Sequence, residues 1–177
     1  AARDTPASRF ALLLVDLDRF GALNELLGHD GGDVLLREAL RRLARCLREG
    51  DLVARIGVHD TQAMAGDVAL PPLGGDECAL VISNLIDARD ALRVAARLHD
   101  ALAAAFPIAG HRLFASACVG IAMNSAGHDS VDDLLRDAYS ALVRAKARGP
   151  ADTQPFDDSA RAAPSEFMEF APAPAAA

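Results

Sequence analysis

Hydrophobic and polar positions fall into blocks that predict alternating strands and helices. A continuous apolar run at residues 9–15 ends in Asp16, and such a run is typical of a strand buried on both faces. Apolar residues that recur every three or four positions indicate amphipathic helices. On these two patterns we expect strands at 51–56, 77–83 and 112–123, and helices at 19–27, 33–48, 88–106 and 131–148.

The helix boundaries carry their own signals. Asp87 and Ser130 are placed to cap the helices that follow them, and Gly149-Pro150 ends the last helix. The order β-α-α-β-β-α-β-α predicts an α/β (α+β) sandwich, in which helices pack against a central mixed, mainly antiparallel sheet. We expect an N-terminal linker at 1–8, one domain at 9–150 and a Pro/Ala-rich linker or tail at 151–177.

Composition narrows the class of protein. The net charge of −7 argues against a nucleic-acid-backbone binder, although it does not exclude one nucleotide bound through a metal. The three cysteines are far apart in apolar surroundings, which favours core thiols in a reducing compartment. No apolar run approaches a membrane span, so we expect a cytoplasmic chain with no membrane segment. Lys146 is the only lysine.

The stretch "LGGDECALV" at 73–81 carries the candidate chemistry. If its Asp76 lies in a hairpin loop beside the end of the first strand, Asp76 and Asp16 converge, and converging carboxylates need a divalent cation. Hard oxygen ligands select Mg²⁺ or Mn²⁺, and Gly74 and Gly75 allow the backbone to approach a triphosphate. A plain hairpin turn also fits "GGD", because Gly-Asp suits such loops.

Four segments in fixed order carry a resemblance. They are "VDLDRFGALNELLGHDGGDVLL", "LGGDECALVIS", "ASACVGIA" and "ALVRAKARG". Together they resemble the GGDEF domain, the diguanylate cyclase family, over about residues 9–150. The resemblance implies a fold like the nucleotidyl cyclases and polymerase palms. It also implies a homodimer in which two GTP are condensed to cyclic di-GMP and two pyrophosphates.

The resemblance also assigns roles to residues. The implied metal ligands are Asp16, the Leu17 carbonyl and Asp76, with Asp76 and Glu77 as the catalytic acids of the signature. The implied GTP contacts are Asn24, His29, Asp33, Gly74, Gly75 and Lys146, of which Asn24 and Asp33 read guanine and Lys146 contacts phosphate. Arg48 and Asp51 form the RxxD spacing of the product-inhibition site, which binds cyclic di-GMP; a solvated helix end explains that weak pattern equally well.

The sequence departs from the family at positions that matter. Gly21 and Pro150 stand where the family has phosphate-contacting Lys and Arg, although Arg19, Arg144 or Arg148 lie near enough in sequence to compensate. An insertion at about 56–72, Ile56–Pro72, separates "VAR" from the signature turn.

Two functional hypotheses therefore remain open. One is a diguanylate cyclase with full or weak activity. The other is a degenerate GGDEF domain that binds GTP or cyclic di-GMP and regulates an attached EAL phosphodiesterase or a partner protein. The tail "QPFDDSARAA" loosely resembles the segment that follows GGDEF domains in GGDEF–EAL tandem proteins. An attached sensor domain is a further partner that the family implies.

Overall fold

The computed structural model describes residues 9–55, 77–124 and 130–156. Within these residues a five-stranded sheet has the order β2-β3-β1-β6-β7. The β6–β7 pair is parallel and the other neighbouring pairs are antiparallel. The predicted mixed, mainly antiparallel sheet flanked by helices is therefore confirmed. The strands of this sheet are β1 (Ala11–Leu17), β2 (Leu52–Arg55), β3 (Glu77–Ile82), β6 (Ala117–Met123) and β7 (Thr153–Pro155).

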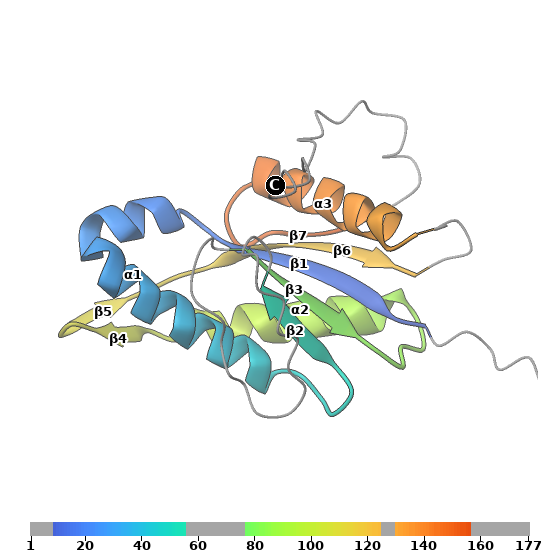
Figure 1. Cartoon of the computed structure of the whole chain (residues 1–177), viewed down its shortest axis with the longest axis horizontal. Helices are drawn as coiled ribbons and strands as arrows, with labels where there is room; N and C mark the ends of the chain where they lie inside the picture. Colours follow the sequence, from blue (N-terminus) through green and yellow to red (C-terminus); the bar gives the residue numbers. More distant parts are fainter. Residues whose placement is uncertain (1–8, 56–76, 125–129, 157–177) are drawn as a thin grey trace, which may run out of the picture.

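Helices cover both faces of the sheet. α1 (Phe20–Arg45) and α2 (Ala88–Ala103) lie on one face, and α3 (Val131–Arg148) lies on the other (Figure 1). Alternate residues of β1 point to opposite faces, so Leu13 and Val15 join the core under α1 and α2, whereas Leu12 and Leu14 pack under α3. Every residue of β1 is buried, as the apolar run predicted.

The first helix agrees in part with the expectation of two helices separated at 28–32. α1 consists of two helical segments joined across a kink (Figure 1), and the residue with non-helical angles at the kink is Gly28, with φ 71° and ψ 167°. A positive φ is inexpensive only for glycine, so the kink falls there. Gly31 and Gly32 continue the helix, and the predicted break is therefore confined to one residue.

The second helix ends earlier than predicted, and the strand expected at 112–123 is divided. α2 stops at Ala103 because the chain enters β4 (Phe106–Ile108), which forms a hairpin with β5 (His111–Leu113). The hairpin turns at Ala109 and Gly110, with φ 50° and 79°. The separate strand β6 follows at 117. Sequence periodicity missed this division because apolar residues run through both pieces.

The third helix agrees with its prediction at both ends. The Ser130 side chain accepts a hydrogen bond from the Asp133 N–H, which caps the N-terminus, and Gly149 follows the last helical residue. Beyond it, β7 adds to the sheet beside β6, within the segment expected to be a linker or tail from 151. Asp87 likewise caps α2, with Asp90 completing a reciprocal capping box.

Candidate functional site

The end of β1 carries a buried carboxylate paired with the one lysine of the chain. The Asp16 side chain is 9% exposed, and its Oδ2 lies 2.7 Å from Nζ of Lys146, whose side chain is 44% exposed. Asp16 continues the row of Leu12 and Leu14, so it faces α3. The structure thus brings together a predicted metal ligand and the predicted phosphate contact.

Close packing of α3 on the sheet explains how Lys146 reaches this position. A Cβ added to Gly120 of β6 would lie 2.3 Å from the Ala138 carbonyl oxygen and the Leu142 nitrogen, so only glycine permits this approach. Ala141 and Ala145 of α3 are also fully buried. Small residues on both elements therefore set the height of the helix above the sheet, and with it the reach of the Lys146 stem.

Glu77 lies across the ladder from Asp16. The two residues are Cα partners in the antiparallel β1–β3 pair, and directly opposed residues share a face of the sheet. Glu77 is partly exposed. The other residues of the predicted signature turn, Gly74, Gly75 and Asp76, lie outside the described residues, as does the insertion at 56–72. The expected convergence of Asp16 and Asp76 therefore stays a prediction.

Leu17, whose carbonyl the resemblance implies as a metal ligand, follows Asp16 at the last position of β1. Its side chain is 3% exposed and belongs to the core under α1 and α2. β1 pairs with β6 as far as Leu17, which lies opposite Ala117. Only backbone atoms of Leu17 are thus candidates for metal binding.

The Asn24 side chain, one of the two predicted guanine contacts, reaches across the kink in α1 to Gly32, the neighbour of the other contact, Asp33. A Cβ at Gly32 would lie 1.5 Å from Oδ1 of Asn24, so the Asn24 amide occupies the space that a side chain at position 32 would fill. Asp33 is the next residue, and both Asn24 and Asp33 are partly exposed. An amide and a carboxylate together offer both donors and acceptors, so the predicted reading of guanine by these two residues stays a prediction.

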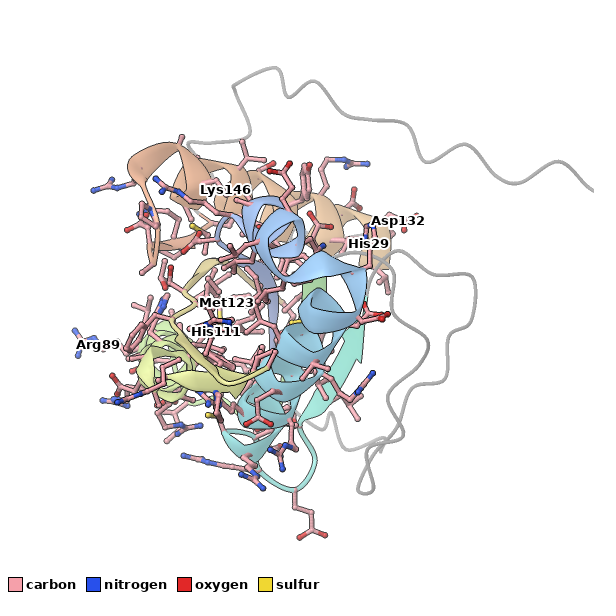
Figure 2. All side chains as sticks on the ribbon, turned by 90° about the vertical axis from the view of Figure 1, so that its left-hand side faces the viewer. His29, Arg89, His111, Met123, Asp132 and Lys146 are labelled. Carbon is pink, nitrogen blue, oxygen red and sulfur yellow. The ribbon has the colours of Figure 1, made fainter. Side chains whose placement is uncertain are left out.

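His29 lies apart from Lys146 in the structure. It lies at the bend of α1 and is exposed, and Figure 2 shows it well separated from Lys146 on α3. Its predicted contact with GTP stays untested by this arrangement.

The predicted product-inhibition pair lies in the turn between α1 and β2. Asp51 accepts hydrogen bonds from the backbone N–H groups of Arg48 and Ser83, each at 3.0 Å. The Arg48 side chain is exposed. Asp51 thus links this turn to the end of β3, a structural use of its carboxylate that RxxD spacing alone did not reveal.

A second aspartate at the β1 end was not among the predicted site residues. Asp18 accepts hydrogen bonds from the Ser116 hydroxyl and from the Ala151 N–H, the latter at 2.8 Å, and its Oδ1 lies 3.1 Å from Sγ of Cys118. Burial, followed by the hydrogen bond to Asp18, raises the pKa of Cys118 to about 11. The alternation in "DLD" places Asp18 on the same face as Asp16 and was the available signal.

Two of the arginines considered as replacements for missing phosphate contacts are engaged elsewhere. Arg144 donates to the Pro155 carbonyl at 2.7 Å, and Arg148 pairs with Asp152 at 3.7 Å. The guanidinium of Arg19, at the start of α1, has no hydrogen bond or ion pair within the described part of the chain. Pro150 lies in the exposed turn after α3.

The donor set fits a hard divalent cation better than a soft one. Asp16 and Glu77 offer carboxylate oxygens on one face of the sheet, and Mg²⁺ is typically held by one or two carboxylates together with substrate phosphates. Within the described residues there is no cluster of three or more His, Cys, Asp or Glu side chains that would hold a metal alone. A metal at this end would thus need Asp76 or a ligand's phosphates.

Comparisons with known proteins identify the family. Residues 1–64 and 64–151 match the family model described as "Diguanylate cyclase, GGDEF domain", and the division at 64 falls inside the predicted insertion. The chain belongs to the GGDEF-domain family of diguanylate cyclases. It is 36% identical over 154 residues to Diguanylate cyclase TpbB of Pseudomonas aeruginosa, covering 84% of this chain and 32% of that protein.

Solved structures agree with this assignment. The GGDEF domain of PA1120 (YfiN or TpbB) from Pseudomonas aeruginosa superposes with a TM-score of 0.72 at 32% identity, covering 85% of this chain and 83% of that one. An EAL/GGDEF domain protein from M. capsulatus gives 0.70 at 31% identity, covering 86% and 88%. The predicted resemblance and its cyclase-like fold are confirmed. The chain spans about a third or less of the curated relatives' full length.

The sequence predicts no membrane segment. No helix among the described residues is long and apolar enough to cross a membrane.

Proposed function

We propose that this chain is a diguanylate cyclase domain that binds GTP with Mg²⁺ or Mn²⁺ and condenses two GTP to cyclic di-GMP. Family membership supports the reaction class. The observation that carries the proposal within this chain is the buried Asp16 carboxylate, which faces Lys146 at 2.7 Å and lies opposite Glu77. A nucleotide triphosphate and a divalent cation need both charge signs at one place, and this end of the sheet supplies them.

The proposed reaction balances without an additional reagent. The 3′-hydroxyl of each GTP attacks the α-phosphorus of the other, a P–O bond forms, and the bond between the α- and β-phosphates breaks. Two such steps release two pyrophosphates and give the cyclic product. Since each step needs a nucleotide on either side, we propose that two copies of the domain, one GTP on each, face one another as a homodimer.

Each residue of the proposed site has a separate proposed role. Asp16, the Leu17 carbonyl and Asp76 would hold the cation, which supplies positive charge to the reacting phosphate oxygens. Lys146 would bind a phosphate oxygen as a point charge. Asn24 and Asp33 would read the guanine edge, Gly74 and Gly75 would let the backbone approach the phosphates, and Glu77 would assist proton transfer from the attacking hydroxyl.

The test is chromatographic detection of cyclic di-GMP after incubation with GTP and MgCl₂. We expect product from the unmutated chain and none from Asp16→Asn. Asp100→Asn is the matched control, because Asp100 is an exposed aspartate on α2. A chain that neither forms cyclic di-GMP nor binds GTP in the presence of Mg²⁺ would overturn the proposal.

A second candidate is a GTP-binding regulatory domain with little turnover. Gly21 and Pro150 replace two family cations, and Arg144 and Arg148 are held by Pro155 and Asp152, which favours weak phosphate binding. GTP binding without cyclic di-GMP formation would support this candidate. Deletion of Ile56–Pro72 then separates two causes: restored activity points to the insertion, and continued inactivity of a folded variant points to the missing cations.

The relatives also suggest a domain attached to this one. Relatives include a bifunctional diguanylate cyclase/cyclic di-GMP phosphodiesterase, MucR of Pseudomonas aeruginosa. We propose that the present chain acts in the cytoplasm, where GTP is available, next to an EAL or sensor domain. Co-expression with such a domain, followed by measurement of phosphodiesterase activity with and without GTP, tests that regulation.

Cyclic di-GMP binding at the RxxD turn is a further part of the proposal. Asp51 is held by backbone N–H groups, so the exposed Arg48 guanidinium would provide most of the contact, bridging phosphate and stacking on guanine. In calorimetry we expect Arg48→Ala to weaken cyclic di-GMP binding at least about tenfold, a loss in the range of a charge-assisted hydrogen bond. If the unmutated chain does not bind cyclic di-GMP, the proposed product site fails and the turn has only a structural role.

A further inference from the structure

The Asp18 carboxylate connects three segments that are distant in sequence. Ser116 lies just before β6, Cys118 lies within β6, and Ala151 follows α3, and each presents a polar hydrogen to Asp18. The Asp18 N–H itself donates to the Ser116 carbonyl at 2.8 Å. All three donors are neutral, so the carboxylate is held by short hydrogen bonds and not by an ion pair among these contacts.

Cys118 extends the connection to the helix end. Its Sγ lies 3.1 Å from Asp18 Oδ1 and 3.3 Å from the Gly149 carbonyl oxygen. Burial and the neighbouring carboxylate raise the pKa of this thiol to about 11, so at neutral pH it keeps its proton and remains a donor. The single S–H donates to one of these two oxygens at a time, and the hydrogen bond from the Ala151 N–H to Asp18 joins the carboxylate to the turn after α3 in either case.

The turn after α3 needs such support. Gly149 has φ 137° and Ala151 has φ 58°, and the left-handed region is unfavourable for a residue other than glycine. Pro150, between them, has no N–H to stabilise the turn. The hydrogen bond from the Ala151 N–H to Asp18 compensates for this backbone conformation. It also fixes where α3 ends relative to β1.

Lys146 and Asp16 lie on the two segments that Asp18 joins. Lys146 is three residues before Gly149 on α3, and Asp16 is two residues before Asp18 on β1. The distance between the end of α3 and the end of β1 therefore sets the span that the Lys146 stem must bridge to reach Asp16 at 2.7 Å. The lysine stem is flexible and 44% exposed, so its own packing does not fix the ammonium.

We propose that Asp18 is a positioning residue, whose carboxylate ties the end of α3 to the end of β1 and thereby holds the Lys146 ammonium beside Asp16. The consequence for ligand binding rests on the proposed function, in which Lys146 contacts a phosphate of GTP. Asp18 itself does not bind the ligand. Both of its oxygens already accept hydrogen bonds from the protein.

The first test uses no nucleotide. Lys146 is the only lysine, so reductive methylation of the folded protein, followed by cleavage at arginine and mass spectrometry, reports its reactivity separately from the N-terminal amine. Asp18→Asn leaves one acceptor oxygen and turns an NH2 donor either toward the Ser116 and Ala151 hydrogens or toward the Cys118 thiol, so the cluster loses an acceptor in both orientations. We expect Lys146 to be methylated several-fold faster in Asp18→Asn than in the unmutated chain.

Ser130→Ala is the matched control for this test. It removes the cap at the opposite end of α3, where Ser130 accepts from the Asp133 N–H, and so weakens the same helix away from Lys146. We expect the Lys146 methylation rate in this variant to stay within about twofold of the unmutated rate, because the cap effect is confined to the first turn. An equal increase in both variants, or none in folded Asp18→Asn, would overturn the proposal.

The second test measures GTP binding in a double-mutant cycle with Lys146→Met. Asp18→Asn should weaken GTP binding about fivefold or more when Lys146 is present and less than about twofold when it is methionine, because coupled residues show interaction energies of roughly 0.5–3 kcal/mol. Equal losses in both backgrounds would show that Asp18 acts on the fold alone and would overturn the proposal.

Two further outcomes are distinguishable. If the unmutated chain binds no GTP, the proposed function fails, and the methylation rates still decide whether Asp18 positions Lys146. If Asp18→Asn does not fold, Ser116→Ala replaces it, since that change removes a single donor to the same carboxylate. The expected direction for Ser116→Ala is the same, with a smaller increase in methylation; an unchanged rate counts against the proposal.

Discussion

The end of β1 and the turn between α1 and β2 each present an aspartate that sequence reasoning assigned to ligand binding, yet the two carboxylates are held differently. Asp16 is buried and faces the ammonium of Lys146 on a flexible stem. Asp51 accepts from the backbone N–H groups of Arg48 and Ser83, and the Ser83 hydroxyl donates to the Gly50 carbonyl at 2.7 Å beside it.

This difference indicates which carboxylate is free to exchange its partner. A side-chain cation can move away when a metal ion or phosphate arrives, so an Asp16–Lys146 pair can be replaced by ligand contacts at modest cost. Backbone N–H groups cannot move away without deforming the turn, and removing the acceptor of the part-buried Ser83 N–H is costly. We therefore expect the Asp51 carboxylate to act mainly in the structure of the turn and the Asp16 carboxylate to exchange its contact with Lys146 for a ligand.

The largest expected effect separates the two aspartates by ligand binding. Asp16→Asn should weaken Mg²⁺-dependent GTP binding by more than about 100-fold, because even residues that only support metal ligands change affinity about 10–100-fold. Asp51→Asn should leave GTP binding within about twofold. Calorimetric titration of GTP in MgCl₂ measures both. Comparable losses in the two variants would erase the contrast between the regions.

The next largest effect concerns stability, for which we expect Asp51 to matter more than Asp16. Asp51→Ala removes the acceptor for two backbone N–H groups, so the free energy of unfolding should fall by about 1–3 kcal/mol. Urea denaturation followed by circular dichroism measures it. Asp100→Ala, an exposed aspartate on α2, should change the same quantity by less than about 0.5 kcal/mol. A similarly small change for Asp51→Ala would contradict the structural role.

A smaller effect depends on pH. It distinguishes the end of β1, where a titratable thiol lies in the Asp18 cluster, from the Asp51 turn, where backbone N–H groups do not titrate. The pKa of Cys118 is raised to about 11 from 9.0, so the unfolded chain loses this proton first. The thiol's contribution to stability is intact below about pH 9 and declines as the pH rises toward 11. At pH 10 the stability lost through this titration amounts to about 1 kcal/mol.

Cys118→Ala isolates this titration, because all other groups remain. The loss of stability between pH 8 and pH 10, measured by urea denaturation, should be about 1 kcal/mol smaller in Cys118→Ala than in the unmutated chain. The backbone N–H groups at Asp51 do not titrate, so Asp51→Ala should leave the pH slope unchanged. Identical slopes for the Cys118 variant and the unmutated chain would argue against the thiol's place in the Asp18 cluster.

The smallest expected effect tests the Arg48 side chain. Because it is exposed, Arg48→Ala should change the free energy of unfolding by less than about 0.5 kcal/mol. The backbone N–H that donates to Asp51 is kept in this variant. Thermal unfolding with and without cyclic di-GMP measures it. A loss above about 1 kcal/mol without ligand would assign the arginine a structural role as well.

Local patterns accounted for most of the fold and part of the site. Helix caps at Asp87 and Ser130, the buried run of β1 and the phase of Asp16 on that strand all follow from side-chain chemistry within a few residues. The β4–β5 hairpin and the strand β7 were missed. Their signals are short or depend on partners distant in sequence, such as β6 beside β7.

The sequence by itself determined the class of fold and the family, because apolar periodicity and an ordered set of motifs are properties of neighbouring residues. Only the tertiary structure decided which carboxylates meet which donors. Asp16 meets Lys146 because Gly120 lets α3 approach the sheet, and Asp18 meets Ala151 because β1 ends beside the turn after α3. Hydrogen bonds and ion pairs form over a few ångströms between residues more than a hundred positions apart, and no local pattern records that distance.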